Sequence, residues 1–305
     1  MSMAEGGGRT LVVGADWSTE SQRGIEWACA LAAPDDRIVL VHAWQMPVVA
    51  GYDMVLAVDP TELTDSAGTA LDQLVADTDD PRIVPVVRQG HAGRELVAEA
   101  DGQDAAMLVL GHSGNSRVAM MLGSTANYVL HHTTRPVVVV RGWVMDEDAE
   151  VTPPRSVVVG VDDHDLDADD SEAIDISHEN PSVRAVRWAF GLPGIERVRV
   201  VHAWFLPSLA IGVHAEIAAE MEEMDAAAQA QIDRVLAAAG PPPDGIELVS
   251  EPVRGTPGFA LIEESRDADL VVLGSRGHGG FSELLLGSTT SEVAAHSHCP
   301  VAVVR

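Results

Sequence analysis

Two stretches of the chain combine a glycine-rich loop with hydroxyl side chains, which together can hold a phosphate group. In the second half, residues 268–290 read ADLVVLGSRGHGGFSELLLGSTT. The apolar run Asp269–Leu273 predicts a buried parallel strand, and SEVAAHSH predicts a helix with a hydroxyl group at its N-cap. Glycine lets the backbone approach an anion, and the first turn of a helix favours negative charge. The stretch therefore has the outline of a phosphate site, with a plain strand–loop–helix connection as the alternative.

The first half contains a second copy of this stretch. Residues 105–127 read AAMLVLGHSGNSRVAMMLGSTAN. Other segments recur in the same order in both halves: RTLVVG at 9–14 and RSVVVG at 155–160, VHAW at 41–44 and 201–204, RPVVVVR at 135–141 and CPVAVVR at 299–305. A repeat of this length is far longer than a solenoid unit, so we predict a duplicated domain.

Strands alternate with helices in each half, and these elements must position the loops. In the first half we expect strands at Leu11–Gly14, Arg37–Trp44, Ile83–Val87, Met107–Leu110 and Val137–Val140, and helices at Ser21–Ala33, Thr61–Asp77, Gly93–Ala100 and Thr125–His131. The alternation predicts an α/β fold with a parallel sheet covered by helices on both faces. Ser18 or Ser21 would cap the first helix, and Trp27 and Trp188 would lie in the two cores.

At 305 residues the chain is long enough for two domains with separate cores. We expect a disordered tail at residues 1–8, one domain at 9–141, a polar, proline-ended linker at 142–154 and a second domain at 155–305. One insert breaks the repeat: Asp163–Pro181 contains eight carboxylates and no arginine. It lacks the glycine and the bidentate glutamate of a calcium loop, so a solvated acidic loop is the favoured interpretation.

The composition limits the partners and the chemistry. A net charge of −28 repels nucleic acid and anionic membranes, so neither is an expected partner. All 19 basic residues are arginine, which excludes a phosphate-binding or Schiff-base lysine. Two cysteines form no disulfide framework, and no apolar run has the length of a membrane span or signal peptide. These features favour a cytoplasmic location.

The motif Gly274-x2-Gly277-x9-Gly287-Ser288, the opening VVGxD strands and the VHAW segments resemble the universal stress protein family. The pattern covers nearly the whole chain twice, so the chain resembles a tandem universal stress protein. The resemblance implies two Rossmann-like (adenine-nucleotide α hydrolase-like) domains, each a five-stranded parallel sheet of order 3-2-1-4-5. It also implies ATP at the carboxyl ends of the strands. Because the chain is strongly acidic, we expect Mg²⁺ with the ATP, since the cation would offset repulsion between carboxylates and triphosphate.

By this resemblance, Asp16 and Asp162 would lie near the adenosine, and the backbones of Ala43 and Ala203 would contact adenine. The residues expected to hold ribose and phosphates are Gly111, Gly114, Gly123, Ser124 and Thr125 in the first half and Gly274, Gly277, Gly287, Ser288 and Thr289 in the second. The aspartates have an alternative role as turn or cap residues. The first-half loop has eight rather than nine residues before its last glycine, so the second-half site fits the family pattern better.

The leading hypothesis is an ATP-binding regulator of stress or dormancy physiology that signals through nucleotide occupancy. The sequence contains no evident nucleophile–base pair and no cysteine–histidine metal cluster, so we do not expect an enzyme, and slow ATP hydrolysis stays open. One alternative is an ATP-using transferase or ligase of the same fold type. Such enzymes usually carry an SGGxDS loop, where this chain has GADWSTES and GVDDHD.

The other alternative is an interaction module that binds no nucleotide, against which the intact second-half glycine motif argues. Whatever the ligand, the apolar fifth strands RPVVVVR and CPVAVVR would leave exposed sheet edges. The resemblance suggests that they pair across domains. We therefore expect a homodimer and, for a regulator, a further protein partner of unknown identity.

Overall fold

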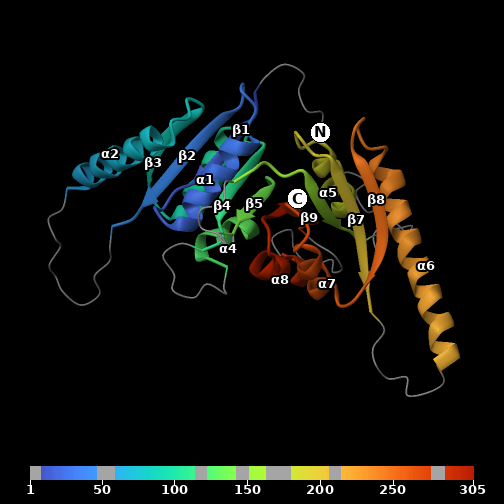
Figure 1. The fold of residues 1–305 in the computed structure, drawn as a ribbon. Helices are drawn as coiled ribbons and strands as arrows, with labels where there is room; N and C mark the ends of the chain where they lie inside the picture. Colours follow the sequence, from blue (N-terminus) through green and yellow to red (C-terminus); the bar gives the residue numbers. More distant parts are fainter. Residues whose placement is uncertain are drawn as a thin grey trace, which may run out of the picture. The chain divides into compact units, whose positions relative to one another are not determined.

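The computed structural model describes residues 8–46, 59–113, 122–141, 151–162, 180–205, 214–275 and 286–305. The chain divides between Thr152 and Pro153 into two compact units, called unit 1 and unit 2 below. Figure 1 shows that each unit contains strands with helices packed on them. None of the helices in the described ranges is both long and apolar enough to cross a bilayer.

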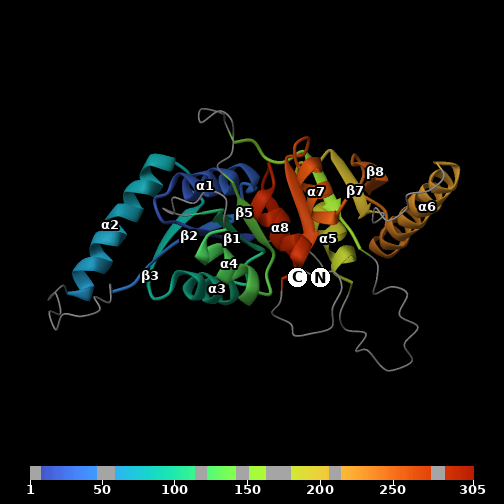
Figure 2. The ribbon, with the colours of Figure 1, turned by 90° about the horizontal axis from the view of Figure 1, so that it is seen from below.

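Unit 1 is a five-stranded parallel sheet with four helices in its described part. In chain order its elements are β1 Thr10–Gly14, α1 Thr19–Leu31, β2 Arg37–Trp44, α2 Pro60–Thr78, β3 Ile83–Gln89, α3 Ala92–Gly102, β4 Met107–Gly111, α4 Ser124–His132 and β5 Val137–Val140. The strand order is β3-β2-β1-β4-β5. Helices α1 and α2 lie on one face of this sheet and α3 and α4 on the other (Figure 2).

Unit 2 repeats this topology. Its elements are β6 Ser156–Gly160, α5 Pro181–Phe190, β7 Arg197–Trp204, α6 His214–Ala239, β8 Glu247–Arg254, α7 Pro257–Glu264, β9 Leu270–Gly274, α8 Ser288–His296 and β10 Val301–Val304. The strands lie in the order β8-β7-β6-β9-β10, all parallel. Numbered within each unit, both orders are 3-2-1-4-5, so the predicted duplicated α/β fold is confirmed.

The central strands are apolar throughout because helices cover both sides of each sheet. Leu11, Val12 and Val13 of β1 have no exposed surface, and the middle strands of unit 2 are equally buried. Each such side chain contributes about 1.5–3 kcal/mol through burial. The first strand of each order is a sheet edge and tolerates proline, at Pro85 in β3 and Pro252 in β8, because the missing N–H is harmless there.

One of the two predicted core tryptophans is placed differently. Trp27 of α1 is 2% exposed, as predicted, but Trp188 of α5 is only half-buried. The two helices fill the core with different residues: α5 buries Phe190, whereas the corresponding position of α1 is Cys29, which is half-buried. A second large aromatic side chain on α5 makes deep burial of Trp188 unnecessary.

Candidate functional site

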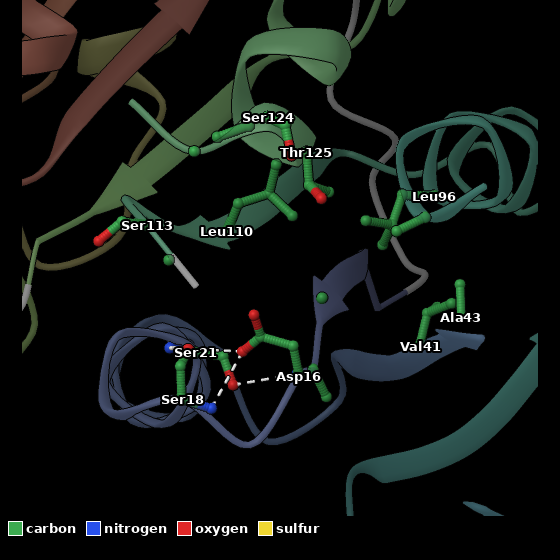
Figure 3. A pocket seen from close by; sticks show the side chains of 16 residues that line it. Asp16, Ser18, Ser21, Val41, Ala43, Leu96, Leu110, Ser113, Ser124 and Thr125 are labelled. Carbon is green, nitrogen blue, oxygen red and sulfur yellow. Dashed lines mark hydrogen bonds between the residues drawn. The ribbon is translucent and has the colours of Figure 1, made fainter. Parts of the chain in front are cut away.

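A cavity of about 400 Å³ opens at the carboxyl ends of β1 and β4 in unit 1 (Figure 3). This edge is where the strand order changes direction, since β2 lies on one side of β1 and β4 on the other. Open parallel sheets bind ligands at such a switch point because the connections leave in opposite directions there. The walls come from strand ends and from the first turns of helices α1, α3 and α4.

Most of the first-half residues singled out by the sequence line this cavity. They are Asp16, Ala43, Gly111, Gly123, Ser124 and Thr125. The seventh, Gly114, lies outside the described residues. Ser113, Leu96 and Leu110 also line the cavity but carried no functional signal in the sequence. Leu96 and Leu110 follow ordinary core patterns, and only the position of Ser113 inside the glycine loop could have pointed to it.

Asp16 combines a structural role with an available oxygen atom. Its Oδ1 accepts hydrogen bonds from the backbone N–H and the hydroxyl of Ser18, and Ser18 in turn caps α1 by accepting from the N–H of Ser21. These bonds fix the turn in which Trp17 adopts a φ of 60°. Within the described residues, Oδ2 accepts no hydrogen bond, and Asp16 is exposed at the cavity wall. The carboxylate can therefore hold the turn and contact a ligand at once.

A serine of the following helix holds the backbone of Asp162 in unit 2, as another serine holds the backbone of Asp16 in unit 1. The hydroxyl of Ser182 accepts from the backbone N–H of Asp162 at 2.8 Å and donates to its carbonyl oxygen at 2.7 Å. In unit 1 the hydroxyl of Ser21 accepts from the N–H of Asp16 at 3.3 Å. The acidic insert lies between Asp162 and Ser182, and residues 163–179 are outside the described part. The residues that flank the insert, Asp162 and Ser182, are nevertheless hydrogen-bonded to each other, as Asp16 and Ser21 are across the short connection of unit 1.

Gly111 and Gly274, which end β4 and β9, are required by packing. A Cβ on Gly111 would lie 2.7 Å from the backbone carbon of Glu20, in the first turn of α1. A Cβ on Gly274 would lie 2.8 Å from the Cβ and 3.0 Å from the backbone carbon of Pro181, at the start of α5. Close approach of strand end and helix therefore explains these two glycines without any ligand.

The helices that follow the glycine loops begin differently from the prediction. The predicted hydroxyl cap is wrong: Gly123 and Gly287 occupy the N-caps of α4 and α8, and neither cap has a side-chain hydrogen bond. The serine hydroxyls fall one position later, inside the first turn. The loops close alike, with the N–H of Gly123 bonding the carbonyl of His112 at 2.8 Å and that of Gly287 bonding Ser275 at 3.0 Å.

The first turn of α4 consequently presents N–H groups that no side chain caps, beside Ser124 and Thr125 in the cavity wall. An uncapped helix start of this kind favours an anion, through its free N–H groups and through the helix dipole. The glycine loop of unit 1 is one residue shorter than that of unit 2. This difference in length lies between the two loop ends, which both units close with an equivalent backbone hydrogen bond. The residues concerned, 114–121 and 276–285, lie outside the described part, as does Gly277.

The remaining second-half residues also lie at the carboxyl edge of their sheet. Asp162 follows β6, Ala203 lies at the end of β7, and Gly287, Ser288 and Thr289 form the start of α8. Unit 2 has one extra bond here, from the hydroxyl of Thr290 to the carbonyl of Gly274 at 3.0 Å. Unit 1 has Ala126 at the position of Thr290, so it lacks this bond.

The described residues place one charged side chain in the cavity lining, and both thiols have raised pKa values. Asp16 is the one charged side chain among the described residues that line the cavity. Burial raises the pKa of both the Cys29 and the Cys299 thiols to about 12, so neither is a thiolate near neutral pH. His42 is committed to packing: its Nδ1 lies 2.9 Å from the carbonyl oxygen of Ala15, and its ring makes a tilted contact with Trp17, with the ring centroids 4.1 Å apart.

No group of three or more His, Cys, Asp or Glu side chains converges as a metal site in the described ranges.

Comparisons with known proteins agree with this architecture. The profile of the universal stress protein family matches residues 8–141 and again residues 173–305. The chain is 30% identical to a universal stress protein of Mycolicibacterium smegmatis, over 97% of this chain and 96% of that protein. It is 28% identical to the universal stress protein Rv2623 of Mycobacterium tuberculosis, with the same coverage. A universal stress protein structure from Archaeoglobus fulgidus superimposes with a TM-score of 0.58 at 19% identity, covering 97% of this chain and 96% of that one.

Proposed function

The chain belongs to the universal stress protein family, and from that premise we propose that it is an ATP-binding regulator of stress-response or dormancy physiology. Nucleotide occupancy would set its conformation or its choice of protein partner. Fast catalysis is not part of the proposal, because burial keeps both cysteine thiols protonated near neutral pH.

The observation that carries the proposal is the cavity of unit 1. Residues scattered from Asp16 to Thr125 come together around about 400 Å³ of space, within the range of small-molecule sites. The lining includes apolar side chains, among them Val41, Ala43 and Leu96, as well as hydroxyl groups and the uncapped start of α4. A nucleotide has the same division into a flat apolar base and an anionic phosphate group.

Each group of lining residues suggests its own role in the proposed nucleotide complex. The backbone of Ala43 at the end of β2 would contact the base, and Oδ2 of Asp16 would accept from a ribose hydroxyl. The first turn of α4 would receive phosphate oxygens through its N–H groups. Mg²⁺ bound to those phosphates would reduce their repulsion by the protein's carboxylates.

Two measurements test the proposal. Purified protein should release an adenine nucleotide on denaturation, and Mg-ATP should give binding heat in calorimetry and raise the melting temperature. If neither heat nor stabilisation is found with the folded chain, the proposed function is overturned.

We also propose a homodimer, for which light scattering should give twice the chain mass of 32.2 kDa; a monomer would remove that part alone.

A further inference from the structure

Glu20, in the first turn of α1, lies against the beginning of the glycine loop of unit 1. Its backbone carbon is 2.7 Å from where a Cβ of Gly111 would be, so strand end and helix start are in direct contact there. Its Oε1 is 3.5 Å from the hydroxyl of Ser113. Ser113 is 4% exposed and lines the cavity. The carboxylate of Glu20 is therefore beside the loop end of the cavity, although it is 93 positions from Ser113 in the sequence.

The cavity consequently combines opposite electrostatic features. The uncapped first turn of α4 attracts an anion, whereas the carboxylate of Glu20 behind Ser113 repels one. No arginine is among the described residues of the lining. Among the described groups, the carboxylate of Glu20 opposes a ligand with several uncompensated negative charges more strongly than a ligand of lower charge.

Unit 2 differs at this position. Pro181 precedes Ser182 and packs on Gly274 in the way that Glu20 precedes Ser21 and packs on Gly111. Proline carries no charge, so a carboxylate at this position of the helix start is a property of unit 1. The scaffold does not require it, because both units close the same contact with different residues.

We propose that Glu20 determines the charge selectivity of the unit 1 cavity, by disfavouring a metal-free triphosphate and admitting one whose charge Mg²⁺ reduces. The inference rests on the proposed nucleotide site and names a residue that tunes it. A charge pair separated by several ångströms in a partly solvated site changes binding by about 3- to 10-fold. The uncharged adenosine carries no phosphate and is insensitive to Glu20.

The test uses the full chain and reads unit 1 separately. Hydrogen exchange of the peptide spanning residues 14–25 is measured in three titrations. The ligands are adenosine, ATP with EDTA and ATP with Mg²⁺. The variant is Glu20→Gln, which keeps the shape and removes the charge. The matched control is Glu62→Gln, since Glu62 also lies in the first turn of a helix, is exposed and is absent from the cavity lining.

Glu20→Gln should strengthen binding of metal-free ATP about 3- to 10-fold, reduce the benefit of Mg²⁺ by the same factor and leave adenosine unchanged. Glu62→Gln should change none of these values. The inference is overturned if Glu20→Gln leaves metal-free ATP unchanged, or if it shifts adenosine and ATP equally. If neither ligand protects the peptide in the parent protein, the proposed function itself fails, which is a different result.

Discussion

Units 1 and 2 make the same turn from their first strand with connections of very different length. Residues 15–18 join β1 to α1, whereas residues 161–180 join β6 to α5. In both, a serine hydroxyl bonds the backbone N–H of the aspartate that follows the strand. The insert is tolerated because its two ends are held in place, and lengthening a surface connection between fixed ends costs little entropy.

The same comparison separates what the scaffold needs from what is free to vary. Gly111 and Gly274 are forced by helix contact in both units, and α4 and α8 start from glycine N-caps with nearly equal backbone angles. The residues around these fixed points differ in hydrogen bonding and in charge. Two copies of one fold can therefore present different sites, and we expect their ligand binding to differ.

The largest expected effect follows from adding a methyl group at Gly111. Gly111→Ala places the Cβ against the backbone of Glu20, which cannot move away as a side-chain end could, so unfolding free energy should fall by about 1–3 kcal/mol. Thermal unfolding followed by circular dichroism measures it. Gly68→Ala in α2 is the control: nothing lies within 4 Å of that position, so alanine should be neutral or stabilising there. Unchanged stability of Gly111→Ala would refute the packing role.

The serine anchors should differ in strength between the units. Ser182→Ala removes two bonds to the backbone of Asp162 and should destabilise by about 1–2 kcal/mol. Ser21→Ala removes one longer bond to Asp16 and should cost about 0.5–1 kcal/mol. Urea unfolding of the two variants side by side compares them. Equal losses of unfolding free energy in the two variants would contradict the expectation that the serine of unit 2 contributes more.

Asp16→Asn should weaken nucleotide binding at unit 1 about tenfold while leaving the fold intact. Asparagine keeps an acceptor oxygen for Ser18, so the turn survives, but the charge offered to a ligand hydroxyl is lost. Exchange protection of peptides from each unit, titrated with Mg-ATP, gives the two affinities separately. Asp162→Asn is the reciprocal variant for unit 2. A variant that binds as the parent does would exclude Asp16 from the site.

The smallest effect is expected from the acidic insert. Replacing residues 163–180 with Trp17–Thr19, which keeps Pro181 and so adds no carboxylate at its position, should strengthen binding of metal-free ATP at unit 2 by about threefold at low salt, since the carboxylates of the insert raise the local negative potential. The gain should disappear at high salt, where exposed charges are screened. Titrations at several salt and Mg²⁺ concentrations test this. Equal affinity in every condition would show that the insert does not influence the nucleotide site.

Much of the architecture was predictable from sequence because it depends on local pattern. Arg37–Trp44 and Val137–Val140 were bounded correctly, since their apolar runs end at polar or turn-forming residues. The duplication supported each assignment with a second copy. The candidate site residues came from the glycine motifs and the family resemblance, and the parallel sheet explains why residues that follow its strands lie at one edge.

Only the tertiary structure determined how the groups at that edge meet. Sequence pattern reports the backbone and burial of neighbouring residues, whereas the contact of Glu20 with Ser113 depends on β1 and β4 being adjacent in the sheet. The same holds for Ser182, whose bond to Asp162 spans the whole insert, and for the helix starts at Gly123 and Gly287. Fold class follows from periodicities that act within a few residues. Site geometry depends on distances between atoms far apart in the chain, which close packing of the two layers of helices on each sheet determines.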